Sequence, residues 1–152
     1  MGNKRVKIAV AEICLVVCAL VWLSLQAVPR LSQAAQESKL AELSDNLYLI
    51  RCTIDMYKSE SGGLFPGQGE PNEPVMPGDF VRALTMAGNQ GRQAYFQQFP
   101  ANPFMAGPDN RNTITCVHDK RAEPDGTEGT AWWFNSATGR FQACDSRFHS
   151  AY

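Results

Sequence analysis

The chain has few of the side chains that most enzymes depend on. It contains only two histidines, His118 and His149, and neither has a ligand-like spacing to a cysteine or a carboxylate. No nucleophile and base stand in a pattern typical of covalent catalysis, and the glycines form no phosphate-binding loop. We therefore expect a protein that is not an enzyme.

An excess of charge of either sign is also missing. The chain of 152 residues has 14 basic and 15 acidic residues, which gives a net charge of -1. Proteins that bind nucleic acid usually present a basic face, whereas the basic residues here are spread out except near the N-terminus. We therefore expect no nucleic-acid partner.

What the sequence does contain is a long apolar run near its start. Residues 8–28 read IAVAEICLVVCALVWLSLQAV and include one charged residue, Glu12. A helix of about 21 residues is roughly 31 Å long, which is enough to cross the hydrocarbon core of a bilayer. Basic residues lie just before the run: Lys4, Arg5 and Lys7. The positive-inside rule would keep this basic leader in the cytoplasm and place the rest of the chain on the other side.

A cleaved secretory signal is the alternative for this N-terminus, because a basic start and an apolar core also fit one. The run is long for that role, however, and no A-x-A cleavage site closes it. A lipoprotein box over residues 15–18 fits poorly, since Val17 stands where a small residue is needed.

A helical pattern continues beyond the apolar run. Apolar residues recur at steps of three and four, as on one face of a helix: Leu40, Leu43, Leu47, Ile50, Ile54 and Tyr57. Gly62 and Gly63 would stop the helix, and Pro29 should loosen it locally. The sequence therefore predicts a long helix from about Ile8 to about Lys58. The organisation that we expect is a basic leader over 1–7, a transmembrane helix segment over 8–29 and an extracytoplasmic domain over 30–152.

The C-terminal part predicts a short helix followed by a small sheet. Asp79 can cap a helix that carries Phe80, Val81 and Leu84 on its apolar side. Strands are predicted over 113–118, 131–135 and 140–144, and Gly139 indicates a hairpin between the last two. We expect an antiparallel sheet that covers the helix stripe. Alternation along the second strand would bury one of Trp132 and Trp133 and expose the other.

The five cysteines form two pairs and one single residue. Cys14 and Cys18 lie inside the apolar run and suit small apolar positions there. Cys116 and Cys144 both fall in predicted strands, and an oxidising compartment would allow them to form a disulfide. A simple three-strand order would keep the two outer strands apart, so both outcomes stay open. Cys52 is left as a free thiol.

Together these features carry a resemblance to a known family. The basic leader, the apolar helix with one glutamate near its start and a proline seventeen residues later resemble type IV pilins and type II secretion pseudopilins. The W-W-F-N-x-x-T-G pattern from Trp132 to Gly139 resembles the last hairpin of pseudopilins. The resemblance implies an α+β, pilin-like fold in which a long N-terminal helix, membrane-spanning in its first half, is packed by a small antiparallel sheet.

The resemblance also implies roles for residues near the N-terminus. Ile8 would be the first mature residue after a prepilin peptidase removes the leader, although the family has glycine where this chain has Lys7. Glu12 would pair with the amino terminus of a neighbouring subunit during assembly. In filaments of this family the helix often unwinds before the proline that corresponds to Pro29.

An oxygen-rich loop in the C-terminal part suggests a calcium site. Carboxylate oxygens are the ligands that calcium prefers, and the loop supplies Asp119, Glu123, Asp125 and Glu128. Major pseudopilins of type II secretion bind calcium near this place in their fold. The alternative is a solvated loop in which Lys120 and Arg121 balance the acidic residues.

These observations predict a single-pass inner-membrane protein with a cytoplasmic N-terminus and a periplasmic C-terminal domain. The resemblance implies a subunit that assembles with copies or relatives of itself into a short filament, a pseudopilus, of a secretion-like envelope machine. Its partners would include the prepilin peptidase and the secretion assembly platform. The alternative is a membrane-anchored binding module that does not polymerise.

Overall fold

A computed structural model describes the backbone of residues 2–87 and 93–151, and the side chains of residues 15–22, 30–87 and 93–151. The chain divides into two compact units, Met1–Ser38 and Lys39–Tyr152, and the second is called the C-terminal unit below. The described part is α+β, with the helices α1, α2 and η1 and a three-stranded sheet.

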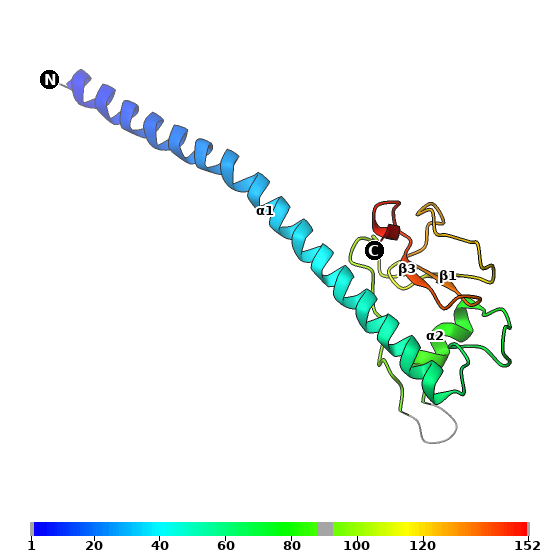
Figure 1. Ribbon diagram of the computed structural model, residues 1–152. Helices are drawn as coiled ribbons and strands as arrows, with labels where there is room; N and C mark the ends of the chain where they lie inside the picture. The colour runs from blue at the N-terminus through cyan, green and yellow to red at the C-terminus, as the bar shows by residue number, and fades with distance from the viewer. Residues whose placement is uncertain (1, 88–92, 152) are drawn as a thin grey trace. The chain divides into compact units, whose positions relative to one another are not determined.

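The first helix, α1, spans Gly2–Glu60 and confirms the predicted long helix (Figure 1). It is unbroken through Pro29, so the predicted loosening there is not observed; a proline removes only one backbone donor from the helix. The helix ends as the glycines predicted. Gly62 has a φ of 68°, and the amide of Gly63 donates to the carbonyl of Lys58 at 2.8 Å, which together form a Schellman cap.

No helix in the described part of the chain has a stretch that is both long and apolar enough to cross a membrane. Of the predicted transmembrane segment, the side chains of residues 8–14 and 23–29 lie outside the described part.

The predicted stripe on the second half of α1 forms one wall of the core. Four of its side chains are buried: Leu43, Leu47, Ile50 and Ile54. The remaining two, Leu40 and Tyr57, are half-buried at the two ends of the stripe. The stripe shares its core with residues of the sheet and of α2, including Trp132 and Phe80. The prediction that the sheet covers the stripe is therefore confirmed.

The short helix α2, Pro77–Thr85, begins three residues earlier than a cap at Asp79 predicted. Met76 is the N-cap residue, and Asp79 lies in the first turn, where it pairs with Arg82 at 3.2 Å. Proline suits the first helical position because that position needs no amide donor. Phe80 is fully buried and packs on Phe134 of the sheet, with ring centroids 4.4 Å apart.

The sheet contains β1 (Ile114–Val117), β2 (Trp132–Asn135) and β3 (Phe141–Ala143), in the order β1-β2-β3. The strands β2 and β3 are antiparallel and form the predicted hairpin, with Gly139 at a φ of 80°. The strands β1 and β2 are parallel, so the prediction of a wholly antiparallel sheet is wrong. The loop over 118–131 is long enough to return the chain for a parallel pairing, which a short turn is not.

Both faces of the sheet are covered. Trp132 and Trp133 are 0% and 1% exposed, so the prediction that one of them faces solvent is wrong. Gln142 lies opposite Trp133 in the register and donates to the carbonyl of Ser150 at 2.7 Å. Ser150 belongs to the short helix η1, His149–Ala151, so the C-terminal segment contributes to the cover on the Trp133 face.

Truncation within the stripe should destabilise the C-terminal unit. Ile50→Ala removes a fully buried side chain and should lower the free energy of unfolding by about 2–5 kcal/mol. The matched control is Leu49→Ala, one residue away on the same helix but 49% exposed, which should cost less than about 1 kcal/mol. Denaturant titration of the full-length protein, followed by tryptophan fluorescence, measures both. Equal losses in the two variants would contradict this packing.

Candidate functional site

The three residues assigned to assembly lie on the first part of α1. Ile8, Glu12 and Pro29 are within the helix, and their side chains lie outside the described part of the structure. Their contacts therefore stay a prediction.

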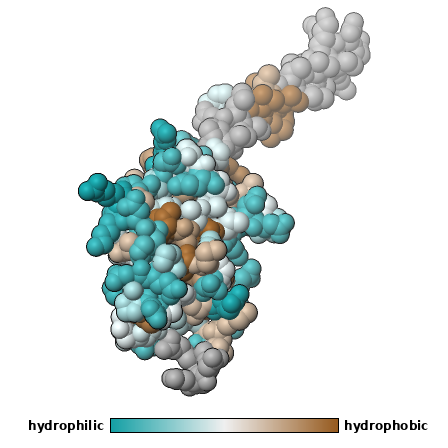
Figure 2. Space-filling model, turned by 90° about the vertical axis from the view of Figure 1, so that its right-hand side faces the viewer, coloured by the Kyte–Doolittle hydropathy of each residue, from teal (hydrophilic) through white to brown (hydrophobic). Residues whose placement is uncertain are grey.

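Described side chains nearby are apolar and exposed. Leu15 is 72% exposed, Trp22 is 62% exposed and Leu31 is 76% exposed. Figure 2 shows the described stretch over 15–22 as a brown band between grey atoms. Contiguous exposed apolar surface of this kind usually marks contact with lipid or with another protein.

The acidic loop does not assemble the predicted calcium site. Its four carboxylate residues are exposed, and no group of three or more metal-ligating side chains occurs among the described residues. Each carboxylate has a partner within the protein instead. Asp119 accepts from the amide of Arg121 at 2.9 Å, and Glu123 forms an ion pair with Arg140.

The other two carboxylates are held by a single turn. Asp125 accepts from the hydroxyl of Thr127 at 2.5 Å and from its amide at 2.8 Å. These bonds, the hydroxyl first, lower the pKa of Asp125. Glu128 accepts from the Thr127 amide at 3.1 Å and from the thiol of Cys144 at 2.7 Å. The carboxylates of the loop thus bind partners within the protein. The number of acidic residues in the sequence does not show this.

Of the two outcomes left open for Cys116 and Cys144, the structure shows the one without a disulfide. Cys116 lies in β1 and Cys144 follows β3, so that β2 separates them, and both are free thiols. Burial raises the pKa of the Cys116 thiol to about 12. Burial and then the bond to Glu128 raise that of Cys144 to about 12 as well. Cys52 is exposed on α1 as a free thiol, as expected.

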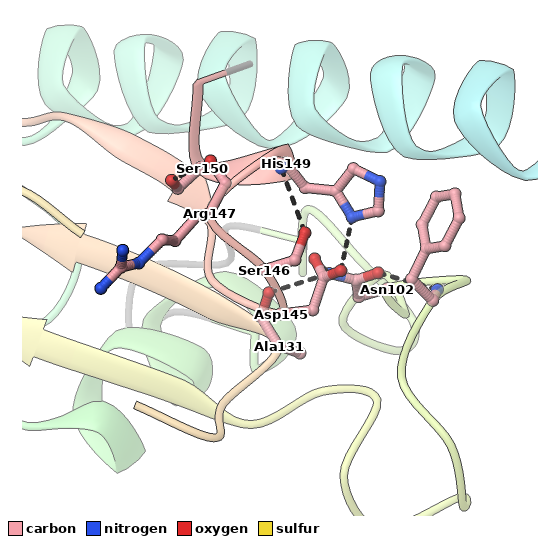
Figure 3. Close-up of polar contacts among 8 residues, drawn as sticks. Asn102, Ala131, Asp145, Ser146, Arg147, His149 and Ser150 are labelled. Carbon is pink, nitrogen blue, oxygen red and sulfur yellow. Dashed lines mark hydrogen bonds and ion pairs between the residues drawn. The ribbon is translucent and has the colours of Figure 1, made fainter. Parts of the chain in front are cut away.

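A buried polar cluster at one end of the sheet escaped the sequence analysis (Figure 3). Asn102 is fully buried, and its amide group donates to the carbonyl of Ala131 at 2.9 Å and to a carboxylate oxygen of Asp145 at 2.7 Å. The other oxygen of Asp145 contacts Nδ1 of His149 at 2.5 Å. The cluster therefore joins three segments that are distant in the sequence.

The cluster is suited to holding the chain in place. The side-chain oxygen of Asn102 accepts from the amide of Phe104 at 2.9 Å, so both ends of its amide group are used. The ring of Phe104 packs on His149 with centroids 4.0 Å apart. Asn102 precedes Pro103 and Phe104 in the sequence, and this short polar and aromatic stretch is the local signal that could have pointed to the cluster.

The other histidine, His118, pairs with a hydroxyl, and this pair is also structural. Nδ1 of His118 lies 2.9 Å from Oγ of Ser136, a distance that would suit a base and a nucleophile. The Ser136 hydroxyl, however, donates to the carbonyl of Val117 at 3.1 Å. The imidazole must then donate to Ser136 and cannot accept its proton. This pair fastens the ends of β1 and β2.

Comparison of the chain with family models, with curated proteins and with solved structures finds no match.

Loss of the Asn102 amide should destabilise the fold. Asn102→Ala leaves the Phe104 amide and an Asp145 oxygen without the Asn102 side chain as a partner, and a buried unsatisfied group costs about 1–3 kcal/mol. Asn110→Ala is the control, because Asn110 is exposed and its side chain makes one long bond of 3.4 Å. The free energy of unfolding of the control, measured by denaturant titration, should stay within about 0.5 kcal/mol of the wild type. A neutral result for Asn102→Ala would contradict the assigned network.

The state of the cysteines is testable by alkylation. If Cys116 and Cys144 are free thiols, the denatured protein should alkylate at both positions without prior reduction, as it should at Cys52. Peptide mapping by mass spectrometry measures this. Alkylation of Cys116 and Cys144 that requires a reductant would show a disulfide and contradict the strand order.

Proposed function

We propose that this protein is a pilin-like structural subunit. It is anchored in the inner membrane by residues 8–29 and assembles through its long helix into a short filament of a type II secretion-like or related envelope machine. Its role is structural, as a subunit of the filament, and no catalytic activity is proposed. The C-terminal unit lies in the periplasm, and the partners are copies or relatives of the chain.

The observation that carries the proposal is that α1 is buried on one face in its second half and exposed in the described part of its first half. The helix has 59 residues, and its stripe is buried only within the C-terminal unit. The described apolar side chains of its earlier part, such as Leu15 and Leu31, are largely exposed. A helix that is apolar but unburied in its own chain needs lipid or other subunits around it. A pilin-like subunit supplies both.

The position of Glu12 supports assembly over simple anchoring. A carboxylate inside a membrane helix costs up to about 2.5–3.5 kcal/mol at the centre and less near the end, where Glu12 lies, and an anchor alone has no use for one. A positive amino terminus on a neighbouring subunit would offset that cost. Cleavage before Ile8 would create such an amino terminus.

A specific feature favours the alternative of an anchored binding module that does not polymerise. Lys7 stands where the family has glycine, so the prepilin peptidase would meet an unusual site. If the leader is kept, the positive group nearest Glu12 in sequence is Lys7 of the same chain.

Replacement of Glu12 separates the two proposals. In Glu12→Val, crosslinks between subunits in membranes should fall by about tenfold or more, because the neighbouring positive group loses a charge-assisted hydrogen bond worth about 1.5–3 kcal/mol. Membrane insertion should be kept, since the change removes a charge from the apolar run.

The control is Glu37→Val, the same change at an exposed glutamate further along α1. It should leave the crosslinks unchanged at matched protein levels. Undiminished crosslinks in Glu12→Val, or no crosslinks in any form of the protein, would leave the anchored module as the better account.

A further inference from the structure

Within the C-terminal unit, the face of α1 that points away from the core is apolar. Tyr48 is 72% exposed, and Leu49, Cys52 and Met56 are exposed beside it. At about 100° per residue these side chains lie within about 60° of Cys52, whereas the buried Ile54 lies about 160° away. A surface helix normally carries polar side chains opposite its buried stripe, so these four exposed residues indicate a contact with a partner. They are called the outer face below.

Acidic side chains accompany the outer face. Glu42, Asp45 and Asp55 are exposed on the same side of the helix. Within the described part of the chain, none of their carboxylates has a hydrogen bond or an ion pair. Arg51 lies between them in the sequence, but its Nε donates to the carbonyl of Phe141 at 2.9 Å. A partner that matches this face should therefore be apolar and positively charged.

Two other partners fit the outer face poorly. Lipid is one of them, because the outer face begins at Tyr48, beyond the proposed membrane segment over 8–29. The outer face of a second copy is the other. Copies anchored in one membrane run parallel, so such a pair would place Asp45 of one copy near Asp45 of the other. Like charges that face each other across an interface are unfavourable.

The C-terminal segment of the chain has the chemistry that the outer face requires. Phe148 is 66% exposed, and Arg147 beside it is exposed as well. The backbone around them is held in place, since the hydroxyl of Ser150 donates to the carbonyl of Arg147 at 3.0 Å. In Figure 3 the guanidinium of Arg147 points away from the cluster of Asp145 and His149.

The charge of Arg147 is not held in a salt bridge. Hydrogen bonds from Thr127, and last the charge of Arg147, lower the pKa of Asp125, but no ion pair of Arg147 occurs among the described residues. Aromatic residues, methionine and arginine are the residues enriched at protein interfaces. The C-terminal segment and the outer face together supply all three kinds.

We propose that the outer face of one copy binds the C-terminal segment of a second copy. In this contact Phe148 packs between Tyr48 and Met56, where an aromatic ring also meets a methionine sulfur favourably. Arg147 pairs with Asp45. The inference rests on the proposed assembly and names the surfaces that meet between two C-terminal units. Because the two surfaces differ, each bound copy still offers one of them to another copy, and contacts of this head-to-tail kind can form open filaments.

A photoreactive residue at Phe148 tests the contact in native membranes. Benzoylphenylalanine keeps an aromatic ring at this position of the full-length chain. After illumination covalent dimers should form, and trypsin should release the attachment site within residues 40–51 or 52–58, which carry the outer face. The control is the same residue at Met86, which is also exposed but lies at the end of α2. It should not attach to these two peptides.

Charge reversal tests the predicted ion pair. Arg147→Asp and Asp45→Arg should each lower the yield of the Phe148 dimer about threefold or more, because an exposed pair worth up to about 1 kcal/mol becomes a repulsion. The double variant should recover most of the yield, since it restores opposite charges. Arg82→Asp is the control, because Arg82 is an exposed arginine of α2 that pairs with Asp79. It should leave the yield unchanged.

The outcomes separate this contact from the proposed function. Attachment of Phe148 to another surface, or a double variant no better than the single ones, would overturn the contact. In that case the filament stands if a photoreactive residue at Leu31 still gives multimers of the chain. An absence of multimers from both positions would remove the contact and the filament together.

Discussion

The contact between the apolar stripe of α1 and the aromatic face of the sheet organises the C-terminal unit. Ile50 and Leu47 on the helix share one core with Trp132, Phe134 and Phe141 on the strands. A small sheet gains stability when its apolar face packs against a helix. The helix in turn needs the sheet, because its stripe would otherwise face water.

The remaining elements close around this contact. The helix α2 adds Phe80 to the core, with its ring 4.4 Å from that of Phe134. On the other face of the sheet the C-terminal segment approaches Gln142 through Ser150. The buried cluster of Asn102, Asp145 and His149 then ties that segment to the loop before β1. Polar groups of this kind contribute to one defined arrangement because each has a partner within the protein.

The elements that the sequence predicted well are those set by local patterns. The stripe repeats at helical spacing, the glycines after Lys58 end the helix, and Gly139 has the positive φ that the hairpin needs. The predictions that failed depend on long-range pairing. The residues around Thr115 and Trp133 do not indicate that β1 and β2 are parallel. Both tryptophans are buried because the C-terminal segment packs on the sheet, and the alternation along β2 does not predict the position of that segment.

The same distinction applies to the candidate sites. The acidic loop offered enough oxygens for calcium, but Thr127 and Arg140 bind several of them. Cys116 and Cys144 were candidates for a disulfide, but β2 lies between their strands and both are free thiols. The bond between Arg51 and the carbonyl of Phe141 could not be predicted either, because the two residues are far apart in the sequence.

We propose that other copies of the chain, as well as lipid, cover the earlier part of α1. A photoreactive residue at Leu31, which is 76% exposed, tests this directly in native membranes. After illumination we expect a ladder of covalent dimers and larger multimers of this chain. Adducts with lipid alone, with no multimer of the chain, would contradict it.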